Sequence, residues 1–214
     1  MLTIVVIAKE CLPGRVKTRL HPPLSYEEAA EVASASLSDT LQVVRDLPVS
    51  RRVLAFDGEN VPAEAEGFTV LPQIGGSLDQ RLGAIFDSVS GPTLLIGMDT
   101  PQVSRRLLED ALTGWTPDID AFLGFASDGG FWALGMRDPN GEHIRGVPMS
   151  QDDTGRVQLG RLRGAGMTVH LLPEINDIDT IDDAIEVAEL VPHGRFGRTF
   201  APLAARLELE RARS

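Results

Sequence analysis

The chain has 214 residues, which is enough for one domain with a sizeable core and does not require a second core. Hydrophobic residues make up 43% of it and aromatic residues 5%, so aliphatic side chains must supply most of the buried surface. Lys and Arg total 20 against 31 Asp and Glu, a formal net charge of -11. Such a chain repels polyanions, which argues against generic nucleic-acid binding, and any bound anion must be held by a local basic cluster.

Cysteine content and hydropathy favour a cytoplasmic protein. Cys11 is the single cysteine, so no internal disulfide can form and a reducing compartment is expected. Residues 1–8 are apolar without a preceding basic segment, which is typical of a first strand and not of a signal peptide. Because no apolar stretch approaches the roughly 18 residues that span a bilayer, we expect no membrane association.

Strand and helix signals alternate along the chain. Buried-strand patterns occupy residues 2–8, 52–56, 69–71, 93–97, 121–125, 131–136 and 167–172, and helical patterns occupy residues 25–46, 77–89, 104–113, 153–165 and 180–190. Ser25 with Glu28, and Ser77 with Gln80, form capping boxes that mark two helix starts. The pattern predicts a single-domain α/β fold of three layers, with helices on both faces of a mixed, mostly parallel sheet. The close strand pair around Asp128 predicts one antiparallel insertion.

The pattern changes after Pro192. We assign residues 1–192 to one domain and residues 193–214 to a C-terminal extension. Residues 193–198 are typical of a loop, and residues 203–212 could form a short charged helix. This extension could cover a surface of the domain or contact a partner subunit of a homodimer, and the sequence leaves both open.

A basic loop follows the first strand. Four of the 20 basic residues fall within eleven positions: Lys9, Arg15, Lys17 and Arg19. Open α/β sheets bind ligands at the carboxyl ends of their strands, so this loop is placed to bind phosphates. Gly14 would let the backbone approach a ligand closely. The glycine spacing is not that of a Walker A loop, and the alternative is a solvated basic turn.

A single carboxylate, Asp99, follows the apolar strand predicted at residues 93–97. A carboxylate at this edge of a sheet can hold Mg²⁺ or Mn²⁺, which takes its other ligands from water and substrate phosphates. The alternative is that Asp99 caps the turn through its own backbone. The basic loop strengthens the metal hypothesis, because both features lie at the carboxyl ends of predicted central strands.

Two acidic motifs follow later in the chain. Asp128, Gly129 and Gly130 between two apolar runs indicate a hairpin turn, although two glycines beside an acid also suit a wall against which a ligand presses. Asp177 and Asp179 precede a helix that Thr180 would cap, a purely structural role. In an extended chain these two acids alternate sides, so at most one would face a shared metal.

A glycine-hinged loop at residues 73–82 leads into a helix N-terminus. Gly76 permits a sharp approach to the helix, and backbone N–H groups at such a terminus suit base or phosphate recognition. Arg81 could supply a positive charge to the same ligand.

Four motifs together resemble a known family. Residues 8–20, 96–101, 128–135 and 177–180 occur in the order seen in an uncharacterised bacterial transferase family of the glycosyltransferase-A-like, nucleotide-diphospho-sugar transferase superfamily. That family looks related to molybdenum-cofactor guanylyltransferases and 2-phospholactate guanylyltransferases. The likeness covers about residues 2–190. This chain departs at Cys11 and Leu12, where family members often carry a second proline, and at Met149, where they often carry a tryptophan.

The resemblance implies the fold of that superfamily and assigns roles to residues. It implies a phosphate-binding loop that begins at Ala8, a metal aspartate at Asp99, and a late metal acid at Asp177 or Asp179. It places the acceptor beside Asp128, Gly129, Gly130 and Ser150. The departure at Met149 bears on this acceptor pocket more than on the nucleotide site.

The favoured hypothesis is metal-dependent nucleotidyl transfer from a nucleoside triphosphate to a small anionic acceptor, with release of pyrophosphate. Lys17 and Asp99 would be the catalytic pair, because phosphoryl chemistry needs mainly positioning and charge neutralisation. One alternative is glycosyl transfer from a nucleotide-diphospho-sugar, and a second is a nucleotide-binding module without catalysis. Fold by itself does not choose among them.

Overall fold

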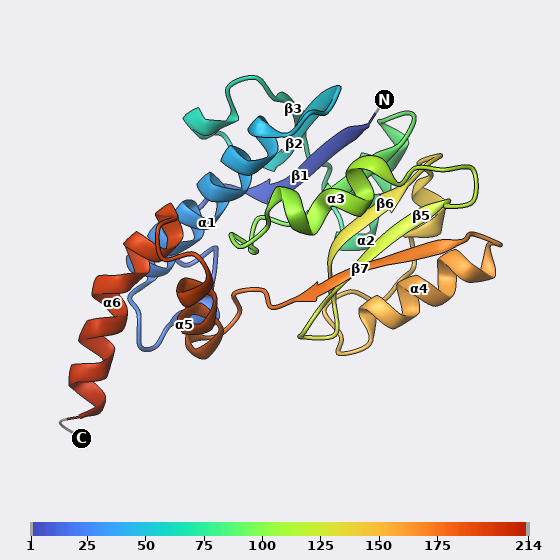
Figure 1. Cartoon of the computed structure of the whole chain (residues 1–214). Helices are drawn as coiled ribbons and strands as arrows, with labels where there is room; N and C mark the ends of the chain where they lie inside the picture. Colours follow the sequence, from blue (N-terminus) through green and yellow to red (C-terminus); the bar gives the residue numbers. More distant parts are fainter. Residues whose placement is uncertain (1, 213–214) are drawn as a thin grey trace.

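The computed structural model describes residues 2–212 and contains a seven-stranded sheet (Figure 1). Its strands are β1 (Thr3–Lys9), β2 (Arg51–Asp57), β3 (Thr69–Pro72), β4 (Thr93–Ile96), β5 (Ala121–Ala126), β6 (Phe131–Met136) and β7 (Val169–Ile175). They lie in the order β3-β2-β1-β4-β6-β5-β7. β6 runs antiparallel to β4 and β5, while the other neighbouring strands are parallel. The predicted antiparallel insertion around Asp128 is thus confirmed.

Helices cover both faces of the sheet, as predicted. α1 (Tyr26–Asp46) and α3 (Arg105–Thr113) pack on one face, and α2 (Leu78–Asp87) and α4 (Thr154–Gly164) on the other. β1 shows why its apolar run is continuous: Ile4 and Val6 belong to the core under α1, and Val5 to the core under α2. Short 3-10 helices occupy Thr18–Leu20, Ala63–Ala65 and Gly141–His143.

The start of α1 is fixed by the predicted capping box. The Ser25 hydroxyl accepts from the Glu28 N–H, and the Glu28 carboxylate accepts from the Ser25 N–H at 2.8 Å. Both groups satisfy helix N–H donors that would otherwise lack partners. α1 then runs to Asp46, the end that the sequence predicts.

β7 lies later in the chain than predicted, at Val169–Ile175 instead of 167–172. The predicted strand stops at Leu172, whereas β7 continues through Pro173, which cannot donate to a sheet. β7 is an edge strand that pairs with β5, so its free side tolerates a residue without an N–H. The shift brings the carboxyl end of β7 to Asn176 and Asp177.

The C-terminal segment also differs from its prediction. The loop predicted at 193–198 lies largely within a helix: α6 (Arg195–Arg211) follows closely after α5 (Ile181–Leu190). The Asp39 carboxylate of α1 accepts from the Arg195 and Phe196 N–H groups at 2.9 Å each and so stabilises the start of α6. Phe196 and Phe200 are fully buried in a core shared with α1 and α5. Figure 1 shows α6 lying along α1, away from the sheet.

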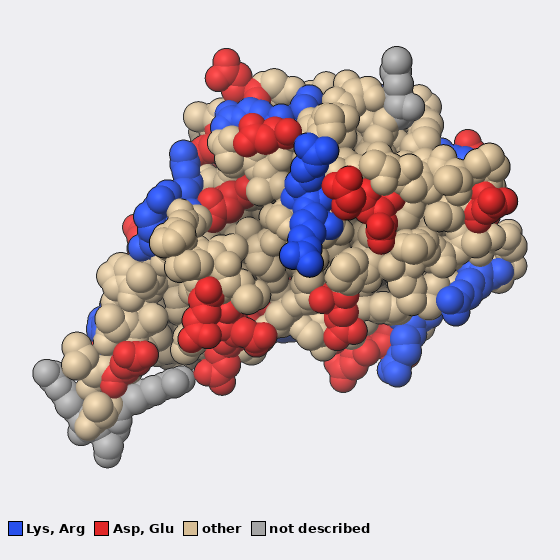
Figure 2. Space-filling model, in the orientation of Figure 1, with Lys and Arg blue, Asp and Glu red and all other residues tan. Residues whose placement is uncertain are grey.

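On the face shown in Figure 2, acidic side chains gather over α5 and basic side chains over α4. None of the helices that the structure describes is both long and apolar enough to cross a membrane.

Candidate active site

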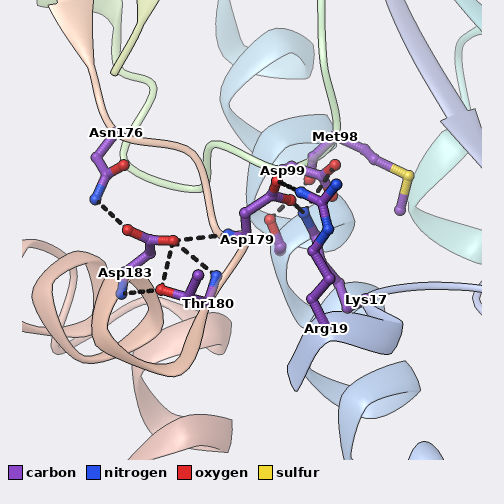
Figure 3. A network of polar contacts seen from close by, with 9 residues as sticks. Lys17, Arg19, Met98, Asp99, Asn176, Asp179, Thr180 and Asp183 are labelled. Carbon is purple, nitrogen blue, oxygen red and sulfur yellow. Dashed lines mark hydrogen bonds and ion pairs between the residues drawn. The ribbon is translucent and has the colours of Figure 1, made fainter. Parts of the chain in front are cut away.

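Three distant segments meet at the carboxyl ends of β1 and β4 (Figure 3). The Lys17 Nζ lies 3.0 Å from Asp99 Oδ2 and 3.4 Å from Asp179 Oδ1. Asp179 Oδ2 also accepts from Arg19 Nη1 at 2.6 Å. The basic loop after β1, the acid after β4 and the acid before α5 thus form one network.

The Lys17 side chain is held tightly. It is only 7% exposed, and its backbone has φ +46, in the left-handed region that non-glycine residues rarely adopt. Burial acts to lower the pKa of Lys17, but the carboxylates of Asp99 and Asp179 outweigh burial and raise it. Lys17 is therefore a fixed positive charge at neutral pH.

Beside this network lies a cluster of three carboxylates. Oxygen atoms of Asp128, Asp177 and Asp179 lie within 4.8 Å of one another. Burial, followed by the charges of Asp128 and Asp179, raises the pKa of Asp177 to about 6. Asp177 Oδ1 is buried and has no hydrogen-bond partner in the described part of the chain. This arrangement leaves negative charge without full compensation.

The sequence-based expectation that at most one of Asp177 and Asp179 would face a shared metal does not match the geometry, because oxygen atoms of both acids lie in one cluster. It assumed an extended chain, whereas the backbone bends at Ile178. The Ile178 N–H donates to the Asp99 carbonyl at 3.2 Å, and its side chain is buried. Because the bend removes the alternation, both acids reach the same cluster.

A cavity of about 360 Å³ opens beside the acid cluster. Eight of the predicted site residues line it: Ala8, Lys9, Arg81, Asp99, Asp128, Gly130, Ser150 and Asp177. A smaller depression of about 170 Å³ adjoins it, because Lys9, Met98 and Asp99 line both. Lys17, Arg19 and Asp179 line this second depression.

Arg15 is separated from the other basic residues. Its exposed side chain lines a different depression, beside Glu10 and Asp57. Gly14 and Gly76 both have positive φ, which explains the glycines, but neither lines the cavity or the depression of Lys17. Of the cations predicted to bind phosphate, Lys17 and Arg19 therefore share one depression, and Arg15 lines another.

The turn between β5 and β6 is a hairpin and also a packing surface. Gly129 has φ +89, and a Cβ there would overlap the carbonyl oxygen of Asp152. Its own carbonyl accepts from the Gly155 N–H at 2.9 Å. This close approach positions residues 150–153 beside the cavity, and it requires glycine.

Gln73 lies at the cavity and is not among the predicted site residues. Its Nε2 donates to the carbonyls of Ala8 and Ala55, at 2.8 and 2.9 Å, and its Oε1 accepts from Arg81 at 3.2 Å. It therefore ties the carboxyl ends of β1 and β2 to α2 at the cavity wall. The signal available in the sequence was a polar residue just after a strand.

Cys11 offers no nucleophile. Burial first, and then the charge of Asp99, raises the pKa of its thiol to about 11. The thiol is therefore protonated at neutral pH, and the thiolate is the reactive form.

Comparison with solved structures defines the class of fold. A protein from Desulfovibrio desulfuricans G20, provisionally assigned as a nucleotide-diphospho-sugar transferase, is 25% identical with a TM-score of 0.82, covering 99% of this chain and 97% of that chain. The 2-C-methyl-D-erythritol 4-phosphate cytidylyltransferase from Thermus thermophilus is 17% identical with a TM-score of 0.55, covering 89% and 98%. The CMP:2-keto-3-deoxy-manno-octonic acid synthetase complexed with CTP is 14% identical with a TM-score of 0.54, covering 89% and 98%. The fold is that of nucleotide-diphospho-sugar transferases, and these neighbours support a transferase at the general level.

The family can also be named. The chain belongs to the family described as "Uncharacterized protein conserved in bacteria (DUF2064)", whose profile matches residues 40–151. A search of the curated proteins found no match. Two of the three neighbours above are named for cytidylyl chemistry, so the expected relation to guanylyltransferases stays a prediction.

Proposed function

We propose that this protein is a metal-dependent nucleotidyltransferase that uses a nucleoside triphosphate and a small anionic acceptor. One observation carries the proposal: the buried Lys17 ammonium lies between Asp99 and Asp179, next to a cavity that further carboxylates line. Fixed charges of both signs at one cavity suit a polyphosphate and its cation.

The residues present fit a divalent cation. Mg²⁺ and Mn²⁺ prefer oxygen ligands, and Asp128, Asp177 and Asp179 bring carboxylate oxygens within 4.8 Å of one another. The unpartnered Asp177 Oδ1 is available as one of these ligands. These three residues would hold the ion, with Asp99 beside them. A bound cation would neutralise phosphate oxygens of the substrate.

The basic residues would act on the leaving group. In the proposed reaction an acceptor oxygen bonds to the α-phosphorus while the bond to pyrophosphate breaks, and the electron pair leaves with pyrophosphate. Lys17 and Arg19 are the cations that would bind the departing phosphates, as they share one depression. Arg15, which lies elsewhere, would contact another part of the nucleotide or none.

Glycosyl transfer from a nucleotide-diphospho-sugar is the second candidate. The provisional assignment of the Desulfovibrio neighbour favours it. The two candidates differ in the ligand that the protein should prefer, a triphosphate or a sugar diphosphate.

Ligand preference tests the proposal directly. The melting temperature is measured with each of the four nucleoside triphosphates and with nucleotide sugars, in the presence of Mg²⁺, Mn²⁺ or a chelator. A ligand at one hundred times its dissociation constant stabilises the folded state by about 2.7 kcal/mol, a shift of several degrees. Trp132 is buried at the cavity, so its fluorescence gives a second readout. We expect a metal-dependent preference for one triphosphate, and preference for a nucleotide sugar would favour the second candidate.

Three substitutions identify the site. Lys17→Met should weaken triphosphate binding at least ten-fold, because it removes a cation that would bind the phosphates. Asp99→Asn should weaken binding at least ten-fold as well, because it removes the carboxylate that positions the Lys17 ammonium. Asp177→Asn should remove most of the Mg²⁺-dependent part of the rise in melting temperature on triphosphate binding. Arg105→Met, on the exposed start of α3, is the matched control. It should change neither the affinity for the triphosphate nor the Mg²⁺-dependent shift in melting temperature. Unchanged binding in the Lys17 and Asp99 variants would refute the proposed site.

A further inference from the structure

Thr100 is a buried residue whose hydroxyl has no internal role. It is 2% exposed, and its Oγ1 has no hydrogen-bond partner in the described part of the chain. Buried hydroxyls are normally hydrogen-bonded, because leaving one without a partner costs free energy.

Three other buried threonines, Thr40, Thr93 and Thr154, follow that rule. The hydroxyl of Thr40 donates to the Ser36 carbonyl at 3.1 Å, and that of Thr93 to the Gly91 carbonyl at 3.0 Å. Thr154 donates to the Pro148 carbonyl at 2.9 Å. Thr100 is thus an exception that a packing role does not explain, since valine would fill the same volume.

The position of Thr100 indicates where its partner comes from. Thr100 lines the 360 Å³ cavity, together with Arg81 and Asp177. Arg81 Nε and Asp177 Oδ1 are also buried without partners in the described chain. Three of the five such atoms therefore belong to residues that line this one cavity, and the remaining two belong to Gln102 and Gln158, which do not line it. A ligand that fills the cavity would therefore lie beside all three residues.

We propose that Thr100 is a ligand-binding residue whose hydroxyl hydrogen-bonds an oxygen atom of the nucleotide substrate. The inference rests on the proposed function and adds a residue to it. Thr100 follows Asp99 directly and shares the cavity with Asp128 and Asp177, so the oxygen that it binds lies beside the acid cluster. That oxygen belongs to a phosphate or to the sugar of the nucleotide.

The test compares binding with stability in two variants. Thr100→Val should leave the melting temperature unchanged or raise it, since it removes a hydroxyl that lacks a partner. It should weaken binding of the preferred triphosphate with Mg²⁺ about ten-fold, the effect of one lost hydrogen bond. Thr100→Ser, which keeps the hydroxyl, should restore most of the affinity.

Thr40→Val is the matched control, because Thr40 is equally buried but bonded within α1. It should lower the melting temperature and leave the dissociation constant unchanged. Thr100→Val binding within two-fold of wild type would overturn the inference, and so would a loss of stability as large as that of Thr40→Val.

Two further comparisons separate the outcomes. A loss of affinity seen with the triphosphate but not with the corresponding nucleoside would assign the bond to a phosphate, and equal losses would assign it to the sugar. If wild-type protein binds neither triphosphates nor nucleotide sugars, the proposed function fails, and the inference fails with it. If wild type binds and Thr100→Val binds equally well, the inference fails by itself.

Discussion

Asp177 contributes a carboxylate to the candidate site but lowers the stability of the folded protein at neutral pH. Its pKa is raised to about 6 because it is partly buried and faces Asp128 and Asp179. In the unfolded chain its pKa returns to the ordinary value near 3.9. Between these values the folded state binds a proton that the unfolded state does not, so stability falls as pH rises from about 4 to about 6.

Asp177→Asn should remove this penalty. We expect the free energy of unfolding of the variant, in chelator, to exceed that of wild type by about 1–3 kcal/mol at pH 7. The difference should become small at about pH 3, below the unfolded pKa, where the wild-type carboxyl is mostly protonated in both states. Denaturant unfolding at both pH values measures it, with the exposed Asp118→Asn as control. A variant less stable than wild type at pH 7 would contradict this assignment.

At the scale of elements, the β5–β6 turn depends on one close contact. Gly129 and Gly166 share a positive φ, of +89 and +81. A Cβ at Gly129 would overlap the Asp152 carbonyl, whereas a Cβ at Gly166 meets nothing within 4 Å. Alanine substitutions at these two positions therefore distinguish the energetic cost of backbone strain from that of steric overlap.

Gly166→Ala should cost about 1–2 kcal/mol, from strain at a left-handed residue. Gly129→Ala should cost clearly more and should also weaken ligand binding, because residues 150–153 must move away from the cavity. Thermal unfolding and nucleotide titration measure the two effects. Equal costs at both positions would show that the contact with Asp152 has no energetic role.

α6 should contribute substantially to the stability of the domain. Phe200 is fully buried and stacks on Phe196 with ring centroids 5.9 Å apart. Phe200→Ala should destabilise the fold by about 3–5 kcal/mol, the usual cost of such a truncation in a core. Leu209→Ala, on the same helix but 60% exposed, should change stability little. A small effect of Phe200→Ala in denaturant unfolding would mean that α6 unfolds separately.

At the scale of the whole molecule, the net charge of -11 should oppose long polyanions while a local cluster binds a short one. Acidic groups lie over α5 in Figure 2, and Asp99 and Asp179 pair directly with Lys17. We therefore expect no retention on immobilised heparin at about 0.15 M salt and neutral pH. Retention would reveal a basic surface that the charge distribution does not predict.

The sequence by itself determined the order and type of nearly all elements, since alternating buried strands and capped helices depend on local pattern. It also determined that Lys17 and Asp99 lie at strand ends that face one edge of the sheet. Both conclusions follow from periodicity and from the geometry of parallel sheets.

The tertiary structure decided which side chains converge. Asp128 joins Asp177 and Asp179 because the chain bends at Ile178. Arg15 lies apart from Lys17, whose backbone takes a left-handed turn before the 3-10 helix Thr18–Leu20. α6 begins at Arg195 because Asp39 of α1 caps it. Local pattern sets the elements, but the directions of side chains in loops depend on contacts between residues that are far apart in the chain.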